Sequence, residues 1–361
     1  MTPVVSHAPA KPISFYSFPS PSSESDPPSF PLGSFRVDSW FSLFLGAMTS
    51  APGPARRCRI PFTLSGESLE GKVRVFGMHA RHPHRGLILI HPLGSLGGSM
   101  NDGIVSELWR AAQASRSFGA VLAYVLKTGL PGATPVLSLG PCSLALSRYN
   151  QRGVGSSPGS VVGSLASKFY LRRTRGGGEK DATDVLRAIE YLVGVIEEEA
   201  GKSQKEQPVE ICLVGYSYGA ALAAQAIDHP NVIKVIGISP PIGSLASFFL
   251  PSQQHLQHLL RIKASDKRGR LIVIGSTDQY TTEQQLLDFV LLNAVGTSDV
   301  TLTVEHHQEP EDNDEALVRR RLSVKEGEQE RLLLEVFSRN DHFWGNDAAV
   351  MVERCLSFAA E

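Results

Sequence analysis

The chain has 361 residues, of which 42% are hydrophobic and 20% are charged, so it is long enough to bury a sizeable core. Its formal net charge of -1 at pH 7 argues against a broad basic surface for nucleic acid. No apolar run reaches the roughly 18 residues that a membrane-spanning helix needs, so we expect a small-molecule partner rather than nucleic acid or a bilayer.

The beginning of the chain differs in composition from the rest. Residues 1–55 are rich in Pro and Ser (FPSPSSESDPPSFPLG) and lack sustained periodicity, which predicts a disordered tail. Met48 offers an alternative start that would shorten this tail. We expect one domain over residues 56–361, and the sequence does not indicate its oligomeric state.

The cysteines are few and widely scattered, at Cys58, Cys142, Cys212 and Cys355. They show neither the CxxC spacing of a metal site nor the density of a disulfide framework. This usage is typical of a reducing compartment, and we expect a cytoplasmic protein.

From about Arg59 onward, short apolar runs alternate with amphipathic segments. We predict strands over residues 72–78, 86–91, 120–125, 209–214, 232–239, 270–276 and 332–338, and helices over residues 101–115, 179–200 and 219–227. Apolar runs of this length separated by helices predict an α/β domain, in which a mostly parallel sheet is covered by helices on both faces.

Three segments interrupt this alternation and are interpreted as insertions. Residues 125–149 are punctuated by Gly and Pro, residues 160–178 carry the basic stretch YLRRTR, and residues 306–331 are mostly charged. Without the first segment, AVLAY and NQRGVG would join as AVLAYNQRGVG, so we interpret it as an aberrant translation product. Loops of this length without structure are uncommon inside compact domains.

The stretch VEICLVGYSYGAALAAQ places Ser217 between two glycines at a predicted strand-to-helix junction. A G-x-S-x-G match alone is weak, but this context is the one expected of a nucleophile elbow. The alternative is a helix-capping serine. In an elbow, Gly215 and Gly219 allow strand and helix to approach closely, so that the hydroxyl of Ser217 projects outward.

A serine hydroxyl needs an imidazole to take its proton, and the imidazole needs a carboxylate to orient it. Behind a nucleophile elbow these follow in the order Ser, Asp or Glu, His. Asp278 follows the predicted strand at 270–276, and His342 follows the strand at 332–338. Glu283 and Asp288 remain rival carboxylates.

Taken together, these motifs resemble the α/β-hydrolase superfamily over about Arg59 to Ala360. The match is closest to small, mostly uncharacterised serine hydrolases with an HP....GG loop, an RGVG.S loop and a DHF.G ending. Here these are His91 to Gly98, Asn150 to Ser156 and Asp341 to Gly345. The resemblance implies an α/β-hydrolase fold with a small cap between Ser239 and Arg270.

The resemblance also implies an oxyanion hole made by the backbone N–H groups of Tyr218 and Leu93. The expected catalytic residues are then Ser217, Asp278 and His342, with no metal and no organic cofactor. The expected activity is that of a serine hydrolase, a carboxylesterase acting on a small ester or acyl substrate.

Other interpretations stay open. A peptidase or an acyltransferase could use the same three residues, and a catalytically silent scaffold could keep the hydrolase shape, because fold alone does not decide function. His79, His82 and His84 could be metal ligands, although Pro83 favours a surface turn. His91 is interpreted as structural.

Overall fold

The computed structural model describes residues 55–61, 68–75, 82, 84–93, 98–115, 117, 120–124, 146–149, 177–200, 207–243, 252–261, 266–294, 300–306, 318–326 and 329–361. Apart from Ala55, the predicted tail lies outside these residues, as does Asn150 to Ser156. No helix within the described residues combines the length and the hydropathy needed to cross a bilayer.

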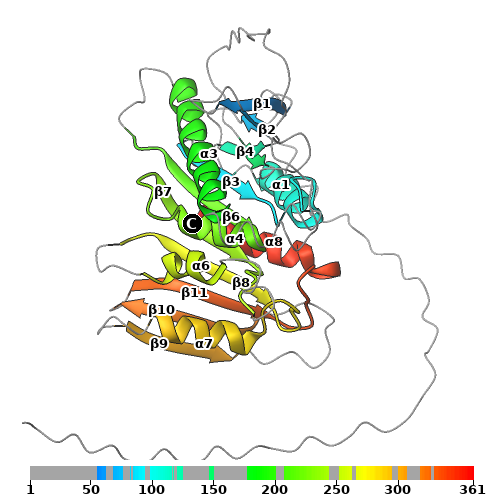
Figure 1. Ribbon diagram of the computed structural model, residues 1–361, viewed down its shortest axis with the longest axis vertical. Helices are drawn as coiled ribbons and strands as arrows, with labels where there is room; N and C mark the ends of the chain where they lie inside the picture. Colours follow the sequence, from blue (N-terminus) through cyan, green and yellow to red (C-terminus); the bar gives the residue numbers. More distant parts are fainter. Residues whose placement is uncertain are drawn as a thin grey trace, which may run out of the picture. The chain divides into compact units, whose positions relative to one another are not determined.

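The described strands form one 11-stranded sheet (Figure 1). The strands are β1 (Arg56–Pro61), β2 (Ser68–Val75), β3 (Arg85–Ile90), β4 (Ala120–Tyr124), β5 (Leu146–Tyr149), β6 (Glu210–Tyr216), β7 (Val232–Ile238), β8 (Gly269–Gly275), β9 (Val300–His306), β10 (Val318–Glu326) and β11 (Gln329–Phe337). Their order across the sheet is β1-β2-β4-β5-β3-β6-β7-β8-β11-β10-β9.

The centre of this sheet is parallel and its two edges are antiparallel. Parallel pairs run from β4 and β5 through β3, β6, β7 and β8 to β11. Antiparallel pairs join β1 to β2 and β10 to both of its neighbours. The prediction of a mostly parallel sheet is therefore confirmed.

Burial explains why the central strands are apolar along their whole length. Every residue of β3 is buried, and so is every residue of β6 after Glu210. A strand covered on both faces has no solvent side, so its sequence is continuously apolar instead of alternating.

The helices are α1 (Gly103–Ser115), α3 (Gly177–Ala200), α4 (Tyr218–Gln225), α6 (Ser252–Leu260), α7 (Glu283–Ala294) and α8 (Ala348–Ala360), with the short 3-10 helix η3 (Gly345–Asp347) before α8. α1 packs against α8, whereas α4 packs against α3 and α6.

Two consecutive residues of β6 show that these groups of helices cover opposite faces. Cys212 donates its S–H to the carbonyl of Ala359 in α8, with 3.5 Å between the two heavy atoms. The side chain of Ile211 lies with α3 residues around Gly86, where a Cβ atom would be 2.8 Å from Ile211 and 2.7 Å from Leu192. Because successive side chains of a strand point to opposite faces, α8 and α3 cover the two sides of the sheet.

The interrupting segments are only partly described. Residues 125–145 and 160–176 lie outside the described residues, whereas Leu146–Tyr149 forms β5. Part of the charged segment 306–331 belongs to the sheet, because β10 pairs with β9 on one side and with β11 on the other.

The segment predicted to form a cap contains α6. This helix connects β7 to β8 and packs against α4 and α7, burying Leu256 and Leu259 as an ordinary crossover helix does. Residues 244–251, including the apolar stretch at Phe248 to Leu250, lie outside the described residues. The cap therefore stays a prediction.

Candidate active site

Ser217 lies between the end of β6 and the start of α4 in a backbone conformation that few non-glycine residues adopt. Its φ is 55° and its ψ is -122°. Its N–H donates to the carbonyl of Ile238 at 2.8 Å, which ties the turn to β7. A positive φ at a non-glycine residue costs on the order of 1–3 kcal/mol and concentrates at functional sites.

The two flanking glycines allow the turn to be this tight. A Cβ atom at Gly215 would lie 2.2 Å from the carbonyl oxygen of Gly219. A Cβ atom at Gly219 would lie 2.4 Å from the carbonyl oxygen of Ile90, at the end of β3. Strand, turn and helix thus contact one another through their backbones, which is the close approach that the motif predicted.

The structure brings Ser217, His342 and Asp278 together. Nε2 of His342 lies 3.0 Å from Oγ of Ser217, and Nδ1 of His342 lies 2.9 Å from Oδ2 of Asp278. The three residues follow the parallel strands β6, β11 and β8, whose carboxyl ends meet at one edge of the sheet. All three are buried, with exposed fractions of 9% or less.

The Asp278 carboxylate determines which ring nitrogen of His342 carries the hydrogen. An ionised Asp278 can only accept, so Nδ1 of His342 must carry its hydrogen and donate it. Nε2 is then the free acceptor of the imidazole, and the hydroxyl of Ser217 donates to it. This arrangement makes the imidazole able to remove a proton from Ser217.

Asp278 is itself held by backbone donors. Its Oδ1 accepts hydrogen bonds from the N–H groups of Tyr280, at 2.9 Å, and Thr281, at 3.1 Å. The hydroxyl of Thr281 donates in turn to the carbonyl of Pro240 after β7, at 2.6 Å. The rival carboxylates Glu283 and Asp288 belong to α7, and Asp288 accepts a hydrogen bond from Gln284 instead.

The loop carrying His342 is folded around its own polar side chains. Oδ1 of Asp341 accepts from the N–H groups of Phe343 and Trp344, at 2.9 and 3.1 Å. The indole of Trp344 is fully buried and donates to Oγ of Ser239 at 3.0 Å. These bonds fix both sides of His342, so the motif D-H-F-x-G acts as one structural unit.

Sequence reasoning missed three residues that contact His342. The hydroxyl of Tyr216 donates to the His342 carbonyl at 2.8 Å, and the side-chain oxygen of Gln279 accepts from the His342 N–H at 3.2 Å. The ring of Tyr280 meets the imidazole edge to face, with centroids 4.6 Å apart. Their positions beside Ser217 and Asp278 were the one available signal, because no periodicity marks them.

Leu93 lies in the loop that follows β3, beside the elbow. Gly98 donates its N–H to the Leu93 carbonyl at 3.1 Å, and a Cβ atom at Gly98 would lie 2.4 Å from the Pro92 carbonyl oxygen. The loop is therefore folded back at its base, and the end of β3 that leads into it contacts Gly219 directly. Residues 94–97 lie outside the described residues.

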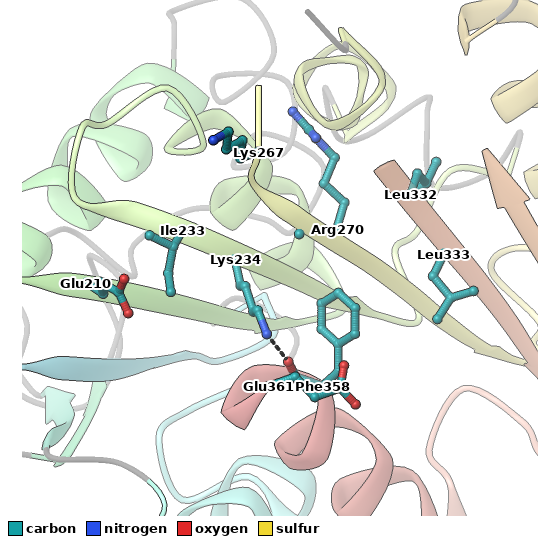
Figure 2. A pocket seen from close by; sticks show the side chains of 10 residues that line it. Glu210, Ile233, Lys234, Lys267, Arg270, Leu332, Leu333, Phe358 and Glu361 are labelled. Carbon is teal, nitrogen blue, oxygen red and sulfur yellow. Dashed lines mark hydrogen bonds between the residues drawn. The ribbon is translucent and has the colours of Figure 1, made fainter. Parts of the chain in front are cut away.

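A cavity of about 440 Å³ lies elsewhere in the fold (Figure 2). Its lining includes Glu210, Lys234 and Gly269, which stand at or near the first residues of β6, β7 and β8. Figure 2 shows the ammonium of Lys234 directed at the end of α8, where it donates to the Phe358 carbonyl at 2.6 Å. Because Ser217 and Asp278 follow the opposite ends of these parallel strands, this cavity is not part of their site.

The other candidate histidines lie before or at the end of β3, or outside the described residues. His91 is fully buried at the end of β3, and its Nδ1 lies within hydrogen-bond distance of the Pro92 carbonyl. His79 lies outside the described residues, and His82 and His84 precede β3.

No family model matches the chain, and no curated protein matches it. Its fold is similar to that of a Xanthomonas campestris protein described as an a/b serine hydrolase without lid, with a TM-score of 0.47, 16% identity, and coverage of 86% of this chain and 96% of that one. A Coxiella burnetii alpha-beta serine hydrolase homologue has a TM-score of 0.47 and 19% identity, and the match covers 85% of this chain and 99% of that one. Mouse alpha/beta hydrolase domain-containing protein 10 has a TM-score of 0.46 and 14% identity, with coverage of 84% and 98%.

Proposed function

We propose that the chain is a serine hydrolase of the α/β-hydrolase superfamily, a carboxylesterase that acts on a small ester or acyl substrate. The observation that carries the proposal is the hydrogen-bonded series Ser217, His342, Asp278, with 3.0 and 2.9 Å between the bonded atoms. A helix-capping serine does not require this series, and the side chain of Ser217 makes no capping hydrogen bond to α4.

In the first step, Oγ of Ser217 attacks the ester carbonyl while Nε2 of His342 takes the hydroxyl proton. Asp278 stabilises the imidazolium that forms, through its bond to Nδ1. The new C–O bond gives a tetrahedral oxyanion, for which the backbone N–H groups of Tyr218 and Leu93 are the proposed donors. Each such donor contributes about 3–4 kcal/mol to rate acceleration in comparable sites.

In the second step, the oxyanion collapses and the bond to the alcohol breaks. His342 gives its proton to the departing alkoxide, which leaves an acyl group on Ser217. Water then attacks this acyl group with His342 as the base, and the acid is released. A peptidase would follow the same steps with an amide carbonyl and an amine leaving group. An acyltransferase would form the same acyl-enzyme and transfer the acyl group to an alcohol or an amine in place of water.

Two further observations bear on this proposal, one on the cellular setting and one on the surroundings of His342. Cys212 and Cys355 are buried free thiols, which agrees with a reducing compartment such as the cytoplasm. Phe343 is 61% exposed and its ring meets the imidazole of His342 at 5.5 Å between centroids, which offers an apolar contact beside the reacting atoms.

A fluorophosphonate probe tests this proposal directly, because it reacts with an activated serine and needs no known substrate. Wild-type protein should be labelled on Ser217, and Ser217→Ala should remove labelling while the melting temperature stays within a few degrees of wild type. Labelling at another residue would move the nucleophile. A folded wild-type protein that resists labelling and does not cleave p-nitrophenyl acetate would favour the silent scaffold.

A further inference from the structure

Tyr216 connects the strand that carries the nucleophile to the loop that carries the histidine. It is the last residue of β6 and directly precedes Ser217. Its side chain is buried, and its hydroxyl donates to the backbone carbonyl of His342 at 2.8 Å. Its ring lies near the imidazole, with 5.7 Å between centroids.

The chemistry of the hydroxyl suits a permanent donor. Burial raises the pKa of Tyr216, and the nearby carboxylates of Asp102 and Asp278 raise this pKa further. The phenol therefore keeps its hydrogen at neutral pH. It can hold the His342 carbonyl without taking part in proton transfer.

We propose that Tyr216 is a positioning residue that keeps the His342 backbone at the correct distance from Ser217, an inference that rests on the proposed function. Tyr216 and Ser217 are consecutive residues at the end of a buried strand, so a bond from Tyr216 to His342 links the two reacting residues by a short, rigid path. Asp278 fixes the far side of the imidazole. The Ser217 to His342 distance of 3.0 Å is thus set from both sides.

The physical reason for such a tether is the steep dependence of catalysis on geometry. A displacement of about 1 Å between reacting groups can lower the rate on the order of 100-fold. The loop containing His342 turns through positive φ at Arg339 and Trp344, conformations that persist only where contacts within the loop and with its surroundings hold them.

Tyr216→Phe tests this role, because it removes the hydroxyl and keeps the ring. We expect kcat for p-nitrophenyl acetate to fall by about 10- to 100-fold with KM within about twofold, because substrate contacts are unchanged and only the alignment of His342 is lost. The rate of fluorophosphonate labelling should fall in parallel.

Thr277→Val is the matched control. Its hydroxyl also donates to a backbone carbonyl of the same loop, that of Asn340, at 2.8 Å. That carbonyl keeps a second donor, the N–H of Thr277 at 2.9 Å, so the loop should stay in place and kcat should remain within about threefold of wild type.

The outcomes separate this role from the proposed function. If Ser217→Ala is still labelled, the proposed function fails. If wild type is labelled on Ser217 and Tyr216→Phe keeps wild-type kcat, or if Thr277→Val loses as much kcat as Tyr216→Phe, the positioning role alone is overturned.

A second, independent observation concerns β4 and β5, which both pair with β2 and β3. Ala120 of β4 is opposite Val75 of β2 and Gly86 of β3. The next position along both neighbours, opposite Arg74 and Leu87, is occupied by Leu146 of β5. The pairing then continues without a gap to Tyr149, opposite Gly71 and Ile90.

If β4 continued in register beyond Ala120, residues 121–124 would occupy the positions between β2 and β3 that residues 146–149 now hold. Val121 is paired with Leu146 and Ala123 with Arg148, an offset of 25 in both cases (146 − 121 and 148 − 123). The segments VLAY and LSRY are therefore in register with each other, and LSRY holds the positions opposite β2 and β3. Both end in a tyrosine, and Tyr149 is followed by Asn150.

From this register we infer that residues 121–124 and 146–149 are alternative occupants of one strand position. The chain can complete its sheet with either segment, and residues between them are not needed for the fold. VLAY is the better match to that position by sequence, because a strand next to the fully buried β3 is favoured when it is continuously apolar.

Two deletions of equal length test the inference. Deleting 125–149 joins VLAY to Asn150, and deleting 121–145 joins Ala120 to LSRY, so each removes 25 residues (149 − 125 + 1 and 145 − 121 + 1) and keeps the register. We expect both shortened proteins to unfold cooperatively, with the melting temperature of the 125–149 deletion the higher of the two and at least equal to that of the full chain. The inference is overturned if either deletion gives an unfolded protein by circular dichroism, or if the 121–145 deletion is the more stable.

Discussion

Nε2 of His342 lies 3.0 Å from Oγ of Ser217, although 125 positions separate the two residues in the chain. The contact exists because β6 and β11 are parallel members of one sheet, with β7 and β8 between them, and both residues follow carboxyl ends of their strands. The imidazole is oriented by Asp278 and packed against the edge of Tyr280.

Asp278→Asn should lower kcat for a p-nitrophenyl ester by about 10³- to 10⁴-fold while the fold survives. The amide keeps the shape of the carboxylate but can present an N–H to His342, which favours the wrong tautomer and no longer stabilises the imidazolium. Steady-state kinetics measure the effect. Asp288→Asn is the control, because that carboxylate bonds Gln284 on the exposed side of α7, and its kcat should stay at the wild-type value. A larger loss in Asp288→Asn would reassign the carboxylate.

Gly219→Ala should destabilise the protein by at least about 1–3 kcal/mol and remove labelling of Ser217. Its Cβ atom would lie 2.4 Å from the Ile90 carbonyl oxygen, so the elbow and the end of β3 would have to separate. Gly194→Ala in α3 is the matched control. It is exposed and has no neighbouring atom within 4 Å of the added Cβ, so the free energy of unfolding should rise by about 0.5–1 kcal/mol. Urea unfolding of both variants measures the difference, and equal effects would contradict the proposed close approach.

The stability of the fold should depend on pH through His255 in α6. Burial lowers the pKa of His255 to about 4, with a smaller contribution from His258, whereas an unfolded chain has a histidine pKa near 6.5. The unfolded state therefore binds more protons than the folded state between these values. The free energy of unfolding should fall as the pH drops from about 6.5 towards 4, by at most about 1.4 kcal/mol per pH unit, and level off below.

His255→Gln isolates this contribution, because glutamine can still accept a hydrogen bond from Gln225 and carries no charge. The unfolding free energy of the variant should depend less steeply on pH over that interval. Denaturant titrations at several pH values give both curves, and parallel curves would show that His255 does not carry the effect.

Activity on short p-nitrophenyl esters should survive treatment with EDTA. The base in the proposed mechanism is His342 and the oxyanion donors are backbone amides, so no step requires a metal ion. Activity that is lost on chelation and restored by zinc would contradict this mechanism and return His79, His82 and His84 to consideration as ligands.

The sequence alone predicts those strands and helices whose pattern depends only on residues close together in the chain. The predicted strands over 86–91, 209–214 and 270–276 coincide with β3, β6 and β8, because continuously apolar runs are needed wherever helices cover both faces. The helices α7 and α8 were not predicted, although each follows a residue that favours a helix start, Thr282 and Asp347.

Two features of the site show which aspects can be predicted from consecutive residues and which require the tertiary structure. The turn at Ser217 could be predicted from the sequence alone, because the steric demand for glycine two residues either side is local to five consecutive positions. The choice among Asp278, Glu283 and Asp288 could not, since which carboxylate reaches His342 depends on how far α7 begins beyond the end of β8. The hydrogen bond from the Tyr216 hydroxyl to the His342 carbonyl and the shared position of β4 and β5 likewise follow only from the tertiary structure. Both depend on which strands become neighbours. Strand order is set by packing across the whole sheet and not by any short stretch of residues.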